Sequence, residues 1–241
     1  MFYRKIAAAA VALCAATPFA YAGDNIDSLP GMSQSQFRLL SEDLGSALSY
    51  KPLTPAESTG TLGFDIGLEV TATKLAHPEI FDRAVSGSAP SSLIVPKVHV
   101  HKGLPFGFDI GASYSAVPNS NIKLMGAELR YALIEGGVAT PAVGLRASYT
   151  TVQGVDQLDL NTTGVDISIS KGLTFLTPYA GVGIVRTDST PNGVPGLVRT
   201  TFNQHKVFVG ANINFALINI AVEADRTGDA TSYGAKLGFR F

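Results

Sequence analysis

Residues 61–73 read TLGFDIGLEVTAT, and this stretch decides the fold. Apolar side chains occupy every second position from Leu62 to Ala72, and the positions between them are polar or glycine. Because the side chains of a strand alternate between its two faces, all the apolar side chains fall on one face. The run is also long enough to cross a lipid bilayer obliquely. It therefore predicts a strand with one face toward lipid.

The same alternation recurs along the rest of the chain. Together the runs make ten strands, an even number as in bacterial single-chain barrels. The predicted strands cover 61–73, 93–102, 106–116, 123–133, 141–151, 160–170, 177–187, 205–215, 218–226 and 231–241. Three of these runs are weaker, and their expected lipid-facing side chains are Val98, Val100, Val165, Ile167, Ile169, Ala180, Val182 and Ile184.

The composition excludes several other classes of protein. Hydrophobic residues make up 46% of the 241 residues and charged residues only 15%, which is unlike a disordered chain or a coiled coil. Beyond residue 22 there is no unbroken apolar run long enough for a membrane-spanning helix. The net charge of −1 argues against a basic nucleic-acid-binding protein. An apolar chain without spanning helices fits one membrane architecture, the closed antiparallel transmembrane β-barrel, so we predict an all-β fold.

The lengths of the connecting segments give the barrel a direction. Even-numbered connectors are short, and the two long ones, 74–92 and 188–204, are both odd-numbered. Outer-membrane barrels have short periplasmic turns and longer outer loops, so we expect both long connectors on the outer side and the C-terminus on the periplasmic side. Aromatic residues are then expected to form two girdles, a periplasmic one of Phe64, Phe108, Tyr131, Phe175, Phe215 and Phe239 and an outer one of Tyr114, Tyr149, Phe202 and Tyr233.

The first 22 residues have the pattern of a secretory signal peptide. Arg4 and Lys5 precede an apolar run, and Ala20-Tyr21-Ala22 supplies small residues at a cleavage site after Ala22. Cys14, the only cysteine, lies in the apolar run, so the mature chain is expected to have neither disulfides nor thiolate metal sites. We therefore divide the chain into a signal peptide (1–22), an N-terminal helical segment (23–58) and the barrel (59–241).

The N-terminal segment does not alternate and predicts a short helix. Ser33 and Gln36 have the spacing of a capping box, and Pro52 and Pro55 end the helical pattern. One face of this helix carries an apolar stripe of Phe37, Leu40, Leu44 and Leu48. Because ten strands enclose little space, we favour a lid under the periplasmic mouth over a helix threaded into the lumen.

The face of the strands turned away from lipid carries charges of both signs. The acidic side chains expected in the lumen are Asp65, Glu69, Asp109, Glu128, Asp166, Glu223 and Asp225. The basic ones are Lys97, Arg130, Arg146, Lys206, Lys236 and Arg240. Because the two sets nearly balance, they predict an ion-pair network rather than a wall of one sign, which a selective pore would favour.

Candidate catalytic and metal-binding residues are sparse. His99 and His101 share one face of a strand, but two ligands are fewer than the three or four that a metal site needs, so no metal or cofactor is expected. His205 is expected on the outer face near the rim, where a lipid hydrolase would need a neighbouring Ser that is missing. A rim protease would need paired acids and a His–Asp pair, and the available residues match no motif: His77, Asp156, Asp188, Asp225 and Asp229. We therefore predict that the protein is not an enzyme.

The last strand resembles the C-terminal assembly signal of bacterial outer-membrane β-barrel proteins. The residues that carry the resemblance are Tyr233, Leu237, Phe239 and the terminal Phe241. The resemblance implies an outer-membrane location, with outer-membrane lipid and the barrel-assembly machinery as partners, but it implies no particular function. Strands 61–73 and 106–116 also open with the same sequence, GFDIG, at 63–67 and 107–111. Either a shared hairpin ancestor or equal demands at equivalent strand positions explains this repeat.

These observations favour an outer-membrane barrel with a narrow, largely closed lumen and a structural or surface-interaction role. The alternative is a channel or porin for small solutes, and an enzyme at the rim is the least favoured. The balance of lumen charges separates the first two readings, and the missing motifs argue against the third.

Overall fold

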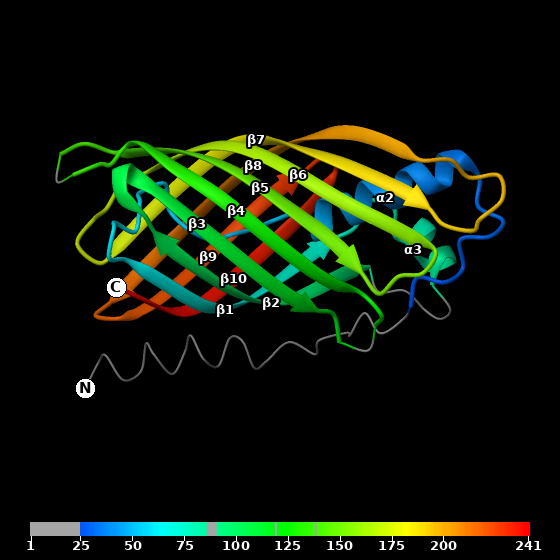
Figure 1. Ribbon diagram of the computed structural model, residues 1–241, viewed down its shortest axis with the longest axis horizontal. Helices are drawn as coiled ribbons and strands as arrows, with labels where there is room; N and C mark the ends of the chain where they lie inside the picture. The colour runs from blue at the N-terminus through cyan, green and yellow to red at the C-terminus, as the bar shows by residue number, and fades with distance from the viewer. Residues whose placement is uncertain (1–24, 86–90, 119, 138) are drawn as a thin grey trace.

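The computed structural model describes residues 25–85, 91–118, 120–137 and 139–241. Ten antiparallel strands close into one barrel, in which each strand pairs with its sequence neighbours and the last strand pairs with the first (Figure 1). This confirms the predicted fold class. The expected signal peptide and its cleavage site after Ala22 lie outside the described residues.

All ten predicted strands are present. They are β1 (Phe64–Lys74), β2 (Ser92–Gly103), β3 (Phe108–Ala116), β4 (Lys123–Ile134), β5 (Ala142–Gln153), β6 (Leu158–Ser170), β7 (Leu176–Pro191), β8 (Thr200–Phe215), β9 (Ile218–Thr227) and β10 (Ala230–Arg240). The helices are α2 (Gln34–Leu48), α3 (Pro78–Ala84) and a 3-10 turn, η1 (Pro105–Gly107). No helix among the described residues has the length and apolar character needed to span a membrane.

Strands β7 and β8 are longer than predicted, with 16 residues each. Their pairing continues to Ser189 and Thr200, so the predicted connector 188–204 shrinks to 192–199. The extra outward side chains are polar, Thr201 and Asn203 of β8 among them, so apolar alternation cannot reveal this part of the strands. Backbone pairing continues where the apolar outer face ends, and we expect these strands to rise above the bilayer.

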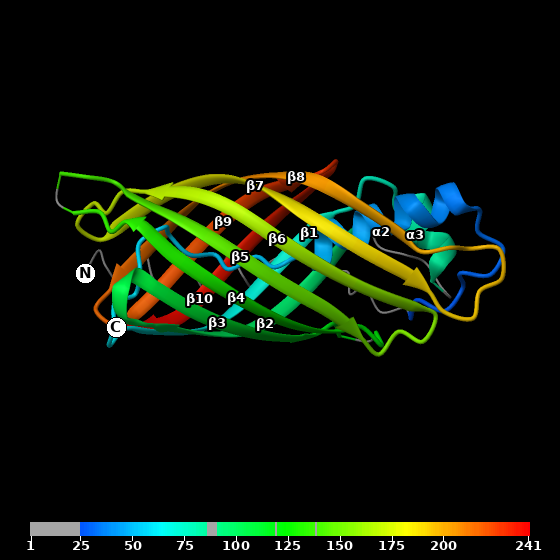
Figure 2. The same cartoon turned by 45° about the horizontal axis from the view of Figure 1, so that its top comes forward.

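The two ends of the barrel differ. Helices α2 and α3, residues 75–85 of the connector after β1, and the connector 192–199 lie at one end, which we call the helix mouth (Figures 1 and 2). The C-terminus and the even-numbered connectors, such as 216–217, lie at the other end, the C-terminal mouth. The structure thus places both long connectors on one side, as their odd numbers predict.

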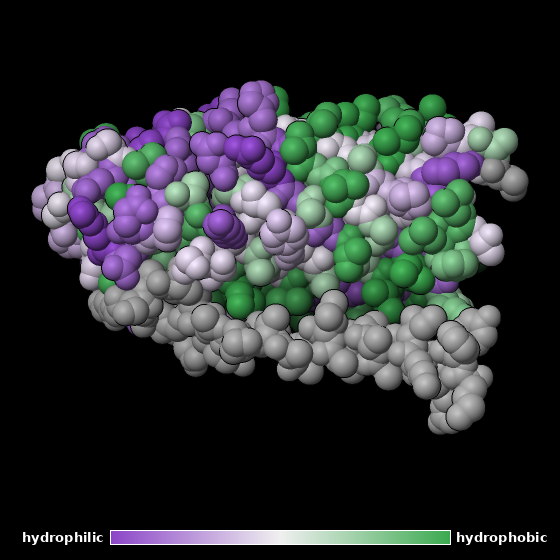
Figure 3. Space-filling view, turned by 180° about the vertical axis from the view of Figure 1, so that it is seen from behind, coloured by the Kyte–Doolittle hydropathy of each residue, from purple (hydrophilic) through white to green (hydrophobic). Residues whose placement is uncertain are grey.

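The outer wall of the barrel is apolar. Its aliphatic side chains are exposed in the chain alone, with Leu68 at 64% and Val209 at 59%. Figure 3 shows hydrophobic side chains over the half of the wall far from the helices, and hydrophilic ones gathered toward the helix mouth. The predicted outward residues of the three weaker strands, such as Val98, Val165 and Val182, are exposed on this wall.

Most of the predicted girdle aromatics lie on the outer wall, with one exception. Tyr114, Tyr149 and Tyr233 are exposed, but Phe202 is only 7% exposed. Phe202 faces the interior, where the guanidinium of Arg38 lies 4.2 Å from the centre of its ring. The assignment of Phe202 to the outer girdle is therefore wrong, because the extended β8 begins at Thr200 and places Phe202 on its inner face.

The predicted helix is present, with Ser33 and Gln36 forming both hydrogen bonds of the capping box. Its placement as a periplasmic lid is wrong. Helix α2 lies inside the helix mouth, and the chain then runs down the lumen to β1 (Figures 1 and 2). At the far end, the Thr59 N–H donates to Asp109 Oδ1 at 2.9 Å. We call residues 25–62 the plug.

Small wall residues make room for the plug. Ser41 Oγ of α2 lies 2.8 Å from Ser189 Oγ, and Ser46 Oγ lies 2.9 Å from the carbonyl oxygen of Thr227. A Cβ on Gly45 would collide with the Thr187 side chain, so a glycine lets the helix approach the wall closely. The lumen therefore has more room for a helix than the number of strands suggests, because short side chains line this part of the barrel wall.

Candidate functional site: the plugged lumen

The charged side chains expected in the lumen lie inside the barrel. All are buried or partly buried, and neighbouring strands hold opposite charges side by side. Arg146 on β5 stands opposite Asp166 on β6, and two bonds of 2.8 and 3.1 Å join them. Arg130 on β4 stands opposite Asp109 on β3, with Nη2 at 3.3 Å from Oδ2. The two bonds between Arg146 and Asp166 fix the geometry of that Arg–carboxylate pair.

A second group surrounds the seam where β10 closes on β1. Asp65 of β1 accepts a hydrogen bond from Lys236 Nζ at 2.9 Å through Oδ2, and its Oδ1 lies 3.0 Å from His99 Nε2. Glu69 lies next to the other side of His99, with Oε1 at 2.7 Å from Nδ1, and also pairs with Lys97 at 2.5 Å. Each carboxylate in this group therefore has a lysine and the His99 imidazole beside it.

The plug supplies charges that the wall lacks. Lys51 Nζ lies 3.1 Å from Asp225 Oδ1, and both side chains are 3% exposed. Glu57 lies 3.7 Å from Arg240 near the C-terminal mouth. The plug adds one charge of each sign to the charged side chains of the wall. The plug is thus a member of the ion-pair network and not only a filler of space.

The wall also hydrogen-bonds the plug backbone. Lys206 Nζ donates to the carbonyl oxygen of Tyr50 at 3.3 Å, and Lys97 Nζ donates to that of Lys51. Arg130 reaches the hydroxyl of Thr54 at 2.9 Å and the carbonyl oxygen of Pro55 at 3.3 Å. These contacts satisfy backbone acceptors that an irregular segment cannot satisfy by itself.

Little free space remains beside the plug. A pocket between Tyr50, Lys97 and Thr150 has a volume of about 30 Å³. This is room for one or two water molecules. This pocket therefore has no room for a hydrated solute.

The helix mouth has a larger pocket of about 290 Å³ at its rim. Its lining includes Asp43, His77, His205 and Asp229, but no Ser, Thr or Cys. Asp43 accepts backbone hydrogen bonds from Ala76 at 3.0 Å and His77 at 2.7 Å, so it ties α2 to the segment before α3. Burial raises the pKa of Asp43, although these backbone donors oppose the rise.

The residues named from the sequence as candidates for a protease site at the rim do not lie together. His77 and Asp229 line the rim pocket, but Asp225 lies in the lumen beside Lys51. Asp188 pairs with Arg199 at 2.7 Å on the outer surface. We find no nucleophile, base and orienting acid together at this rim among the described residues.

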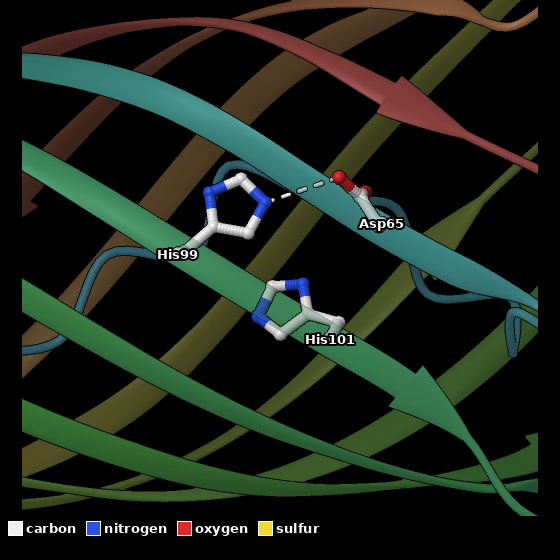
Figure 4. Close-up of side chains that lie close together, drawn as sticks. All are labelled: Asp65, His99 and His101. Carbon is white, nitrogen blue, oxygen red and sulfur yellow. Dashed lines mark hydrogen bonds and ion pairs between the residues drawn. The ribbon is translucent and has the colours of Figure 1, made fainter.

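The structure adds residues that the sequence did not indicate. Lys51, Tyr50 and Glu57 take part in the lumen from a segment that has no alternation to mark it. Asp65 also joins His99 and His101 in one cluster (Figure 4). The proximity of these three side chains follows only from the pairing of β1 with β2, which places Asp65 opposite His101.

Comparison with known proteins finds similarity in shape to solved barrels of bacterial outer membranes. No protein-family model and no curated protein matches it. The N-terminal barrel domain of Pseudomonas aeruginosa OprF is 15% identical, with a TM-score of 0.37, over 73% of this chain and 97% of that one. The porin KdgM, solved with oligogalacturonate, is 8% identical at a TM-score of 0.40, over 73% and 99%. The outer-membrane protease OmpT of Escherichia coli is 10% identical at 0.39, over 74% and 95%.

Proposed function

We propose that this protein is a plugged outer-membrane barrel that does not conduct at rest and serves a structural or surface-interaction role. One observation carries the proposal: the part of the plug from α2 to Thr59 runs inside the barrel from the helix mouth to the Asp109 side chain near the start of β1 (Figures 1 and 2). A hydrated solute would have to displace this segment to cross.

The cost of displacing the plug supports a closed resting state. Removing Lys51 from the lumen leaves Asp225 without its partner, and an uncompensated buried charge costs about 3–5 kcal/mol. Withdrawing α2 also exposes Phe37, Leu40 and Leu44, all of which are at most 1% exposed. Polar and apolar contacts therefore hold the same segment, and both would have to break together.

The helix mouth offers a folded surface for contacts outside the membrane. Helix α3 packs on α2 through Ile80, Phe81 and Ala84, which are buried. Ile26 pairs with Val85 across the same region. With the long connectors on the outer side, this packed cap faces the surroundings of the cell. Outer-membrane lipid and the assembly machinery remain the proposed partners of the barrel wall and of β10.

Planar-bilayer recording of the purified barrel tests the closed state. We expect no steady conductance from the unmodified chain, and large openings when residues 25–52 are deleted. A steady channel of general-porin size in the unmodified protein would contradict the proposal. A gel shift on heating shows whether the deleted form still folds.

A channel for small solutes is the second candidate, since Glu, Lys, Ser and Thr side chains make the wall behind the plug hydrophilic. A disulfide between Ser41→Cys and Ser189→Cys would lock the plug, because their hydroxyls are 2.8 Å apart and Cys14 is the only native cysteine. Brief openings that occur only after reduction of this disulfide would favour a gated channel. An equally silent reduced form favours the closed barrel.

A further inference from the structure

The most concentrated cluster of ligand-type side chains lies on β1 and β2, inside the lumen. Asp65, His99 and His101 each direct one ligand atom to a common space, and these atoms lie within 4.8 Å of one another (Figure 4). All three residues are at most 1% exposed. From this geometry we propose that the cluster is a binding site for a divalent transition metal, with Zn²⁺ as the ion that fits it.

One nitrogen of the cluster has no other partner. Nδ1 of His101 is buried and makes no hydrogen bond with any described residue. Its other nitrogen, Nε2, lies 2.9 Å from Glu128 Oε1. A carboxylate beside one ring nitrogen holds the proton there and leaves the lone pair of the other nitrogen for a metal. Figure 4 shows a ring nitrogen of His101 turned toward Asp65.

His99 has the same kind of support. Its Nδ1 lies 2.7 Å from Glu69 Oε1, and its Nε2 faces Asp65 Oδ1 at 3.0 Å. When Glu69 holds the proton on Nδ1, the Nε2 lone pair points at the space shared with Asp65. Lys236 occupies the other carboxylate oxygen of Asp65 at 2.9 Å, which leaves Oδ1 for the ion.

Two glycines leave space for the imidazole rings of His99 and His101. Gly67 stands opposite His99, and a Cβ on it would lie 2.6 Å from the ring carbon Cε1. Gly111 stands opposite His101 on the other side, and a Cβ there would also collide with that ring. These are the last residues of the two GFDIG repeats, so β1 and β3 leave matching space on both sides of β2.

The donor set selects the metal. Two imidazoles and one carboxylate suit zinc, which bonds nitrogen and oxygen at about 2.0–2.2 Å and takes water as a fourth ligand. A tetrahedral ion with bonds of that length would separate His99 Nε2 and Asp65 Oδ1 slightly from their present 3.0 Å and bring His101 nearer to both, through rotations about the side-chain bonds. The ion would join β1 to β2 beside the seam with β10, and would add to the closure of the barrel.

Charges around the site accommodate the ion. The carboxylates of Asp65, Glu69 and Glu128 face it, and the nearest cations are Lys97, Lys236 and Arg130. Tyr50 of the plug also approaches, with its hydroxyl 3.4 Å from His101 Nε2. Because the plug covers the cluster, we expect the metal to enter while the barrel folds.

Zinc content of the refolded full chain tests the proposal. The protein is folded into detergent with Zn²⁺ alone, freed of loose metal, and analysed by elemental emission. We expect one ion per chain in the unmodified protein and in His205→Gln, the matched control whose histidine is exposed on the outer wall. His101→Gln should lose the ion, and Glu128→Gln should bind about 10–100-fold more weakly.

Cobalt provides a readout that does not need the variants to fold. Co²⁺ in the unmodified barrel should give the visible absorption of a site with nitrogen and oxygen ligands. A folded unmodified chain that retains no zinc and shows no such absorption overturns the proposal. Full retention of the ion by folded His101→Gln overturns it as well.

Discussion

The two halves of the lumen are held together in different ways. Toward the helix mouth the plug packs on apolar wall residues, among them Leu93, Leu124 and Leu160. Toward the C-terminal mouth the same strands turn charged side chains inward, such as Glu128 and Arg130 on β4. Helix α2 is therefore anchored by the hydrophobic effect, while residues 50–59 are anchored by ion pairs and hydrogen bonds.

We expect the largest effect from a substitution in the apolar half of the lumen, toward the helix mouth. Phe37→Ala removes a side chain that is fully buried between the plug and the wall. Truncation of this kind costs about 3–5 kcal/mol. We expect α2 to loosen while the strands stay paired, as hydrogen exchange of α2 against β5 would show. Equal protection of α2 in both proteins would contradict the anchoring role of its apolar stripe.

A change in the charged half of the lumen, toward the C-terminal mouth, should lower the free energy of unfolding by slightly less. Lys51→Met leaves the Asp225 carboxylate buried without its cation, at a cost of about 3 kcal/mol. The double variant with Asp225→Asn removes both charges and should recover part of the loss. Urea unfolding in detergent measures both variants. A double variant no more stable than the single one would show that this pair does not anchor the plug.

The smallest expected effect is at the start of α2. Ser33→Ala removes the N-cap bond to Gln36, for which about 1 kcal/mol is typical. Because packing of Phe37 and Leu40 also holds the helix, we expect only the first turn to fray. Hydrogen exchange at residues 34–37 measures this effect. A loss as large as that of Phe37→Ala would mean that capping, and not burial, fixes α2.

The strands could be predicted because a lipid-facing wall imposes a simple rule on every second residue. Ile66 and Leu68 follow this rule, as do the strands near Tyr114 and Leu237. The rule fails where both faces are apolar, as at Leu93, Ile94 and Val95, because the inner face there packs on the plug. It also fails where the outer face is polar, at the extended ends of β7 and β8.

The candidate sites were less accessible to sequence reasoning. The lumen charges could be named from strand parity, but their partners depend on register, which pairs Arg146 with Asp166. Asp65 and the two histidines lie on different strands, so counting ligands along one strand found only two. The roles of Lys51 and Tyr50 could not be seen at all, because the plug follows no periodic pattern.

The barrel, its number of strands and a helix capped by Ser33 could be predicted from the sequence alone, since these depend on local periodicity and capping. Tertiary structure decided which mouth the helix occupies and what fills the lumen. The apolar stripe of α2 needs a partner surface, and residues far apart in sequence create that surface: Leu75, Leu124, Val152 and Leu160. Only closure of β10 on β1 brings them around one axis, so no local pattern could have revealed the plug.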